Sequence, residues 1–166
     1  LEPVGDDPAA AGASATRAAV QQAGGRASAI LTLAFMGPEE KMLAGVAQVA
    51  PGVPVVGGTA SDGAGRFQQF GHGRVEAQAV TVAAVGGPVG YAFAHGYRPT
   101  GRKAVVTRAQ GRRILELDRR PALAVYAEWT RAAEAEIKGG AILGYSVFHP
   151  LLLHKNGDTL AVHPVN

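Results

Sequence analysis

The strongest constraint on the fold is an amphipathic segment that lies between two apolar runs. The runs are "ASAILTLAFM" (27–36) and "VPVV" (53–56), and both are typical of buried strands. The segment between them (37–52) places its apolar residues at helical spacing. Pro38 and Glu39–Glu40 suit the start of a helix, where carboxylates interact favourably with the helix dipole. This order of strand, helix and strand predicts a parallel βαβ unit.

A further helix is expected before this unit. Asp7 is a suitable N-cap residue, and Pro8 suits the first position of a helix. Residues 9–23 are strong helix formers, and Gly24–Gly25 supplies a stop signal. Residues 1–6 carry no pattern and are expected to be irregular.

The second half of the chain has a different pattern, which favours antiparallel strands. We expect strands over 75–85 and 89–97, a hairpin over 103–118 with its turn at Gln110–Gly111, a long helix over 120–137, and strands over 141–149 and 159–165. The predicted fold class is therefore α/β (α+β mixed). It has an initial βαβ unit, followed by a mostly antiparallel mixed sheet with flanking helices.

Composition excludes several classes of protein. The chain has 166 residues, of which 47% are hydrophobic, so it can bury a core. It lacks cysteine, which removes disulfides and thiolate chemistry. Its net charge is only +3 and its aromatic content 6%, so a nucleic-acid-binding face is not expected. The sequence shows neither an apolar run of membrane-spanning length nor a signal peptide. We therefore expect a cytoplasmic protein without membrane insertion.

A glycine-rich stretch follows the second apolar run and raises two interpretations. It reads Gly57-Gly58-Thr59-Ala60-Ser61-Asp62, without the ending of a phosphate-binding P-loop. In the first interpretation, the glycines permit a turn and Asp62 forms a local hydrogen bond. In the second, the end of the strand offers backbone amides and the hydroxyls of Thr59 and Ser61 to a small ligand.

Histidine is the only residue type here that suggests a metal. His149 and His154 are five residues apart, which would place them on opposite faces of a strand, so a zinc site is not expected. A single histidine can hold a haem iron, and His72 and His95 are the candidates. The alternative for His95 is a partly buried side chain that bonds to the backbone.

Catalysis is not expected, although one set of residues resembles a hydrolase triad. Ser61, Asp62 and His72 supply the residue types, but the chain lacks the G-x-S-x-G turn that exposes a nucleophile. The enzyme hypothesis makes Ser61 the nucleophile and His72 its base, and it predicts turnover of a simple ester.

Residues 95–129, "HGYRPTGRKAVVTRAQGRRILELDRRPALAVYAEW", carry a more specific pattern. The residues in question are Gly96, Arg98-Pro99, Gly101, Val106-Thr107, Gly111, Leu115-Glu116-Leu117-Asp118, Pro121-Ala122 and Val125-Tyr126. In order and spacing they resemble the FIST sensory domain family of bacterial signalling proteins. The stretch "VPVVGGTASDG" (53–63) is similar to the strand and glycine turn that precede this pattern in the family.

The resemblance implies an intracellular input domain and not a catalyst. It implies binding of a small ligand, an amino acid or another small polar carboxylate, and signalling to a partner such as a kinase or cyclase. It also implies one domain over 1–166, in a shortened form, with an N-terminal helix region over about 1–26. Residues from about 139 to 166 would begin the family's C-terminal half.

The residues and the resemblance together predict a ligand site. Its candidate residues are Gly57, Gly58, Thr59, Ser61, Asp62, Arg98 and Thr107. Arg98 suits a carboxylate because its guanidinium can form two parallel hydrogen bonds, and the alternative for it is a surface position before Pro99. Two other functions remain open. One is a nitric-oxide-responsive haem sensor that uses His95 or His72, since some family members bind haem. The other is an interaction module without a ligand, which pairs through an exposed strand edge.

Overall fold

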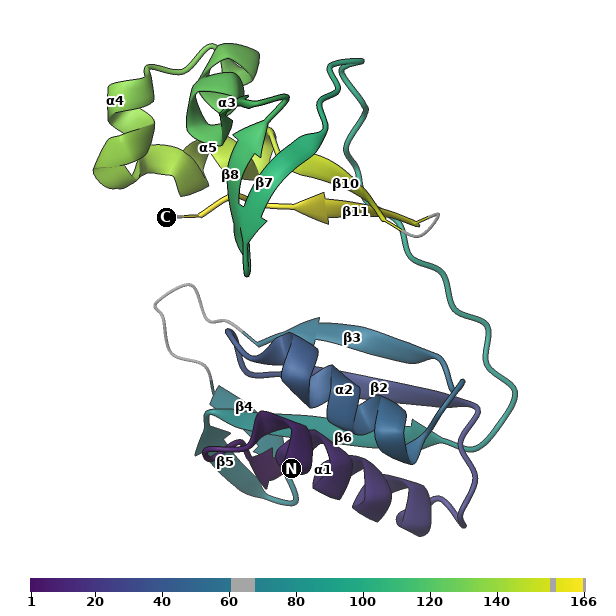
Figure 1. The fold of residues 1–166 in the computed structure, drawn as a ribbon. Coiled ribbons are helices and arrows are strands. Elements are labelled where there is room, and N and C mark those ends of the chain that lie inside the picture. The colour runs from purple at the N-terminus through teal and green to yellow at the C-terminus, as the bar shows by residue number, and fades with distance from the viewer. Residues whose placement is uncertain (61–67, 156–157, 166) are drawn as a thin grey trace. The chain divides into compact units, whose positions relative to one another are not determined.

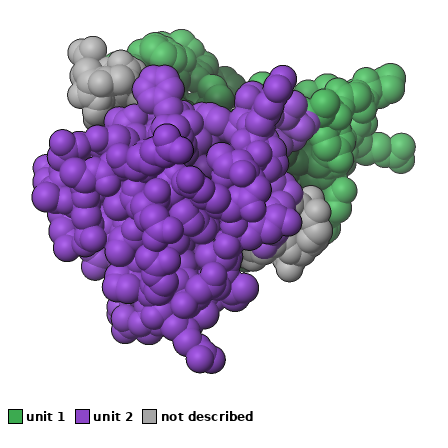
Figure 2. All heavy atoms as spheres, turned by 90° about the horizontal axis from the view of Figure 1, so that it is seen from above, with its two compact units in different colours: residues 1–92 green, residues 93–166 purple. Residues whose placement is uncertain are grey.

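The computed structural model describes residues 1–60, 68–155 and 158–165. The chain divides into two compact units, Leu1–Ala92 and Phe93–Asn166, which Figure 2 shows in different colours. Figure 1 labels most of the helices and strands of each unit. The prediction of a single domain over 1–166 stays a prediction.

The first unit is built on a four-stranded sheet with two helices. Its elements are β1 (Glu2–Pro3), α1 (Pro8–Gln22), β2 (Ala29–Ala34), α2 (Glu39–Val49), β3 (Val55–Thr59), β4 (Gln68–Gly71), β5 (Arg74–Ala77) and β6 (Ala79–Val85). The sheet has the order β1-β6-β2-β3, and β2 pairs parallel with β3 and antiparallel with β6. The predicted βαβ unit is therefore confirmed, with β2 as an inner strand.

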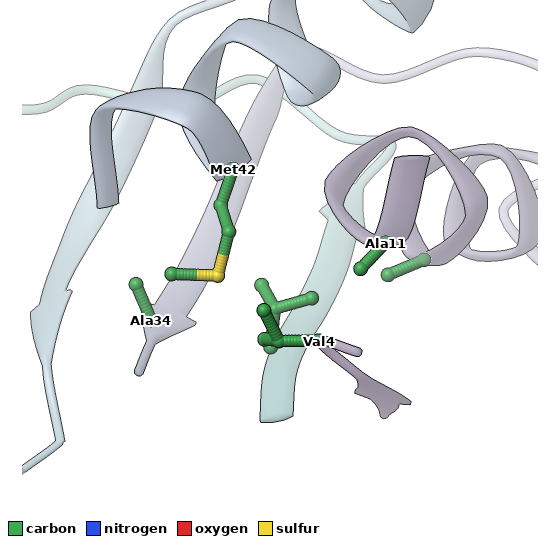
Figure 3. Close-up of a cluster of buried hydrophobic side chains, with 6 residues drawn as sticks. Val4, Ala11, Ala34 and Met42 are labelled. Atoms are coloured by element: carbon green, nitrogen blue, oxygen red, sulfur yellow. The ribbon is translucent and has the colours of Figure 1, made fainter. Parts of the chain in front are cut away.

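The core of this unit lies between the sheet and its two helices. Val4, Ala11, Ala34 and Met42 pack together in it, as Figure 3 shows. Alternate residues of β2 face the helices, because Ala34 contacts the Met42 cluster, whereas Leu33 on the opposite face is 44% exposed. Burial therefore alternates along β2, although its exposed face also carries apolar residues, Leu31 and Leu33.

Helices α1 and α2 approach each other closely through small residues. A Cβ atom on Gly12 of α1 would lie 2.2 Å from the carbonyl oxygen of Met42 in α2. A Cβ atom on Gly45 of α2 would lie 1.9 Å from the carbonyl oxygen of Ala9 in α1. Real Cβ contacts are never this short, so only glycine fits at either position.

The start of α1 confirms the predicted cap and supports a stability prediction. Asp7 Oδ1 accepts a hydrogen bond of 3.0 Å from the Ala10 N–H, and Pro8 follows at the start of the helix. Asp7→Ala should lower the free energy of unfolding by about 1 kcal/mol, because it removes this cap. Urea unfolding followed by circular dichroism measures the change. Asp6→Ala is the control, since Asp6 is an exposed neighbour. Equal losses in both variants would contradict the role of the cap.

Two predictions for the first unit were wrong at strand boundaries. Residues 1–6 are not wholly irregular, because Glu2–Pro3 pairs with β6. Residues 75–85 form two strands, β5 and β6, which are separated at Gln78 with a φ of 53°. This left-handed residue lets β5 pair with β4 while β6 joins the main sheet, and the Gln78 carbonyl accepts from the Val4 N–H at 2.8 Å.

The second unit consists of small antiparallel sheets and short helices. Its elements are β7 (Val106–Gln110), β8 (Arg113–Leu117), β9 (Arg120–Pro121), α3 (Ala122–Thr130), α4 (Glu134–Glu136), the π-helical segment η1 (Ile137–Ala141), α5 (Ile142–Phe148), β10 (Leu151–Lys155) and β11 (Asp158–Val162). Strands β7, β8 and β9 form one sheet, and β10 pairs with β11 in another. The hairpin predicted over 103–118 is confirmed.

The long helix predicted over 120–137 is interrupted. Helix α3 ends at Thr130, because Arg131 adopts a left-handed conformation with a φ of 57°. The chain then turns through α4 and η1, where Gly140 has a φ of 103°. These turns place Ile137 in one buried cluster with Tyr126 of α3. The burial of these apolar side chains stabilises the interrupted arrangement.

Two strands predicted in this half were wrong. Residues 141–149 form α5, because Ile142 and Ser146, one helical turn apart, are both buried and Ile142 packs with Tyr126. Residues 89–97 form no strand and have no ladder partner among the described residues. Tyr91 and Phe93 in this stretch are 62% and 80% exposed, so burial does not stabilise it.

The predicted α/β fold class is confirmed, with helices, one parallel strand pair and several antiparallel pairs. The antiparallel strands after the βαβ unit are distributed over several small sheets in the described residues. None of the helices in the described ranges combines the length and the hydropathy that crossing a bilayer requires.

Candidate ligand-binding cavity

The residues predicted to form one ligand site fall in two different units. Gly57, Gly58 and Thr59 belong to β3 of the first unit, whereas Arg98 and Thr107 belong to the second. The predicted Ser61 and Asp62 lie outside the described residues. Neither unit therefore contains all the described residues of the predicted ligand site.

The glycine pair after "VPVV" belongs to a strand, which corrects the expectation of a loop. Strand β3 continues through Thr59, at one end of the sheet order. Gly57 has a φ of 151°, and a Cβ atom there would lie 1.7 Å from the carbonyl oxygen of Thr32 in β2. Gly58 has open space where its Cβ would be. The close approach of two strands therefore explains Gly57 without a ligand.

Thr59 forms a hydrogen bond with a carboxylate of the first unit. Its hydroxyl donates to Glu39 Oε1 at 3.2 Å, and the Gly37 N–H donates to Glu39 Oε2 at 2.9 Å. Glu39 thus places a negative charge at the start of α2, where an anionic ligand would otherwise be favoured. A second carboxylate would meet like charge here, so the surroundings of Thr59 do not suit the carboxylate ligand that the sequence predicts.

Thr107 and its neighbours in the family pattern hold a turn in the second unit. The Thr107 hydroxyl accepts from the Arg119 N–H at 2.8 Å, and Asp118 Oδ1 accepts from the Val105 N–H at 2.8 Å. Asp118 and Arg119 are both left-handed, with φ values of 49° and 62°. These hydrogen bonds stabilise the connection from β8 into β9 and account for Thr107 and Asp118.

The second unit contains a cavity of about 760 Å³. This volume lies within the range of about 300–1,000 Å³ that is typical of small-molecule sites. Residues 96–105, which form the first part of the family pattern, line this cavity. The other lining residues are Ile114, Leu117, Asp118, Tyr126, Trp129, Thr130, Phe148, His149, Pro150, Leu151, Leu152, Leu153, His154 and Val162. All of them belong to this one unit.

Three cationic side chains lie on one wall of the cavity. They are Arg98, Arg102 and Lys103. Arg102 donates to the backbone carbonyl of Trp129 and so ties this wall to the end of α3. The side chains of Arg98 and Lys103 form no hydrogen bond or ion pair with any described residue. Arg98, which the sequence predicts as a ligand residue, therefore lines the cavity with its guanidinium unpaired.

The rest of the cavity wall is largely aromatic and aliphatic. Burial raises the pKa of Tyr126 above its ordinary value, so its phenol stays neutral at physiological pH. That phenol donates to the carbonyl of His149 at 2.9 Å. Trp129 and Phe148 add two further aromatic rings, and β10 contributes leucines. The lining thus combines three cationic residues at 98–103 with aromatic and aliphatic residues.

Two contacts connect the cavity wall with the end of α5. The phenol of Tyr97, a lining residue, donates to the carbonyl of Val147 at 3.1 Å. His163 Nδ1 lies 2.8 Å from the carbonyl of Ser146, and its ring meets that of Tyr97 edge-on with centroids 5.8 Å apart. Since carbonyls only accept, His163 donates from Nδ1. The last carbonyls of α5 are therefore satisfied by side chains near the cavity.

Sequence reasoning missed most of the apolar wall. Tyr126 and Trp129 are three residues apart on α3, a spacing that places them on one face and could have indicated their shared role. Residues 148–154 gave no such signal, because the incorrect strand over 141–149 obscured the end of α5 and the start of β10.

The two histidines predicted as haem ligands do not line this cavity. His72 is exposed, in the turn between β4 and β5, with a φ of 51°. The Nδ1 of His95 accepts from the Tyr97 N–H at 3.3 Å, which is the expected hydrogen bond to the backbone. The expected partial burial of His95 was wrong, because the side chain is exposed.

A buried haem does not fit these two histidines. Its porphyrin needs apolar enclosure around the axial ligand, and both side chains are exposed. Within the described ranges, three or more His, Cys, Asp or Glu side chains do not gather into a metal site. No step through haem follows from this arrangement.

The fold and the cavity define an α/β protein with an open cavity of small-molecule size in its second unit. The model of the FIST N domain family matches residues 2–120, which is more than half of the chain. The chain therefore belongs to the FIST N domain family, a family of sensory domains in signal transduction. The match includes the cationic wall of the cavity at 96–105, whereas part of the apolar wall lies beyond residue 120.

One curated relative is an archaeal protein. The chain is 38% identical over 80 residues to "Uncharacterized protein MJ1623" of Methanocaldococcus jannaschii. The aligned part is 46% of this chain and only 16% of that protein. No solved structure matches the chain.

Proposed function

We propose that the chain is a sensory input domain whose second unit binds a small carboxylate. The observation that carries the proposal is Arg98, which lines a cavity of about 760 Å³ and whose guanidinium has no partner in the part of the chain that the structure describes. Membership of the FIST N domain family supports the sensory role. The cationic wall falls within the residues that the family model matches.

The proposed ligand places its carboxylate against Arg98. The planar guanidinium can donate two parallel hydrogen bonds to the two carboxylate oxygens, and Lys103 adds a second positive charge. Apolar residues that also line the cavity would contact the rest of the ligand. The neutral phenol of Tyr126 adds no opposing charge.

We propose that occupancy of the cavity is transmitted to a signalling partner such as a kinase or cyclase in the cytoplasm. Tyr97 lines the cavity and holds the Val147 carbonyl of α5, so a ligand that displaces Tyr97 would alter how α5 ends. The proposed role is non-catalytic. It is tested by assaying hydrolysis of p-nitrophenyl acetate, which should not depend on Ser61 or His72.

The binding proposal predicts a specific loss in an Arg98 variant. Arg98→Gln removes the charge and the paired donors, so affinity for a carboxylate ligand should fall at least about 10-fold, which corresponds to about 1.4 kcal/mol. Thermal shift across simple carboxylates and amino acids identifies a ligand, since ligands that bind the native state raise the melting temperature. Isothermal titration calorimetry then compares the two proteins. Arg113→Gln is the matched control, because Arg113 lies on β8 but does not line the cavity.

Two outcomes contradict the proposal. Equal affinity in Arg98→Gln and the unmodified protein would remove Arg98 from the site. The absence of any thermal shift across the panel would instead favour the interaction module without a ligand, for which β3 offers an edge that pairs with no other described strand.

A further inference from the structure

We infer that the cavity prefers carboxylates that have an apolar body and no α-ammonium group, and that it discriminates against free amino acids. This inference rests on the proposed binding of a carboxylate at Arg98. It concerns the two parts of the ligand that Arg98 does not contact, namely the group beside the carboxylate and the body of the molecule.

The charges around the cavity disfavour an ammonium group. Arg98, Arg102 and Lys103 supply three positive charges, whereas Asp118 is the only carboxylate among the described residues that line the cavity. An α-ammonium group is held next to the carboxylate of an amino acid, so it must approach the same cationic wall. Like charges a few ångströms apart repel each other, and a partly apolar surrounding increases this repulsion.

Asp118 is poorly placed to offset that repulsion, because the turn uses it. Its Oδ1 accepts from the Val105 N–H at 2.8 Å, and its own N–H donates to the Val105 carbonyl at 2.9 Å. These two hydrogen bonds fix Asp118 against the segment that leads into β7. Oδ1 therefore already has a structural partner, and the single negative charge of Asp118 is outnumbered by the three cationic residues of the lining.

The aromatic and aliphatic residues of the lining favour an apolar body. Trp129, Phe148 and the leucines of β10 present aromatic and aliphatic surface to the cavity. A ligand made only of polar groups would leave this surface in contact with water, whereas an aryl or alkyl group would remove it from water. Together the cationic and the apolar residues of the lining fit an amphipathic monocarboxylate.

Three matched ligands test the inference by calorimetry on the full chain. They are 3-phenylpropionate, L-phenylalanine, which adds the α-ammonium group, and phenethylamine, which keeps the ammonium group and lacks the carboxylate. We expect 3-phenylpropionate to bind at least about 10-fold more tightly than L-phenylalanine. Phenethylamine should show no binding.

A variant that supplies a negative charge tests the cause of this preference. Thr100 lines the cavity, and its Oγ1 accepts from the Arg102 N–H at 3.4 Å, a role that an Asp side chain can keep. Thr100→Asp should reduce the preference for 3-phenylpropionate over L-phenylalanine several-fold, whereas the neutral isostere Thr100→Asn should preserve it. A preference that is unchanged in Thr100→Asp would overturn the electrostatic argument.

The failure of this inference is distinguishable from the failure of the proposed function. If L-phenylalanine binds as tightly as 3-phenylpropionate and Arg98→Gln weakens both, the carboxylate site stands and the selectivity is overturned. If none of the three ligands binds, both the inference and the carboxylate site it rests on lose their support.

Discussion

Gly45→Ala is expected to lower the free energy of unfolding of the first unit by about 3 kcal/mol. A Cβ atom at this position would lie 1.9 Å from the Ala9 carbonyl oxygen and 2.8 Å from the Ala13 backbone nitrogen. Both are backbone atoms of α1, so no side chain can move aside and the helices must separate. The loss exceeds the gain of about 1 kcal/mol that alanine brings to a helix. Urea unfolding monitored by circular dichroism measures the difference.

The same substitution in an open position provides the control for Gly45. Gly144 lies in α5, and a Cβ atom there would meet no atom within 4 Å. Gly144→Ala should therefore leave stability unchanged or raise it by up to about 1 kcal/mol. If Gly45→Ala and Gly144→Ala changed stability equally, the close approach of α1 and α2 would be wrong.

Gly57→Ala is the second substitution with a large expected effect, again about 3 kcal/mol of lost stability. Its Cβ atom would lie 1.7 Å from the carbonyl oxygen of Thr32. That carbonyl belongs to β2, which is held by hydrogen bonds to β3 on one side and β6 on the other, so it cannot withdraw. The φ of 151° at Gly57 adds strain for any residue with a Cβ atom. Thermal and urea unfolding of the full chain both report the loss.

Gly58 is the neighbour that separates a structural role from a ligand-binding role. Open space surrounds its Cβ position, so Gly58→Ala should change stability by no more than about 0.5 kcal/mol. If these glycines instead lined a ligand site, both alanine variants would lose ligand affinity while stability stayed unchanged. That result would restore the sequence-based interpretation of the stretch and remove the steric explanation of Gly57.

The first half of the fold was predictable because its signals are local. Asp7 and Pro8 set the start of α1, and the near-continuous apolar run at 29–34 indicates the inner strand β2, although it does not indicate which face the helices cover. The glycines at 12 and 45 were the missed signal, since a glycine inside a helix costs stability and usually has a packing reason. The sequence alone does not show which two helices such glycines bring together.

The second half was less predictable because tertiary contacts override local propensity there. The apolar residues of 141–149 favour a strand, yet burial of Ile142 against Tyr126 makes the segment helical. The left-handed Arg131 that ends α3 has no sequence signal, because arginine rarely adopts this conformation. The same limit hid that Trp129 and Phe148 line one cavity.

Of the candidate ligand-binding cavity, the sequence predicted one lining residue, Arg98. Arg98 was selected from the family pattern, and it lines the cavity, although its pairing with a carboxylate remains a proposal. Thr107 came from the same pattern, yet its hydroxyl holds the Arg119 N–H. Sequence patterns do not separate residues that build a turn from residues that meet a ligand, because both roles call for the same hydroxyl and carboxylate groups.

The most direct test of the central claim is a ¹H–¹⁵N NMR titration of the full chain with 3-phenylpropionate. The chain has a single tryptophan, so Trp129 gives one indole N–H signal at the cavity wall. We predict saturable shifts of this signal and of the amides of 96–105 and 148–154, with the amides of 55–60 unchanged. Shifts confined to 55–60, with a stationary Trp129 indole, would contradict the cavity as the ligand site.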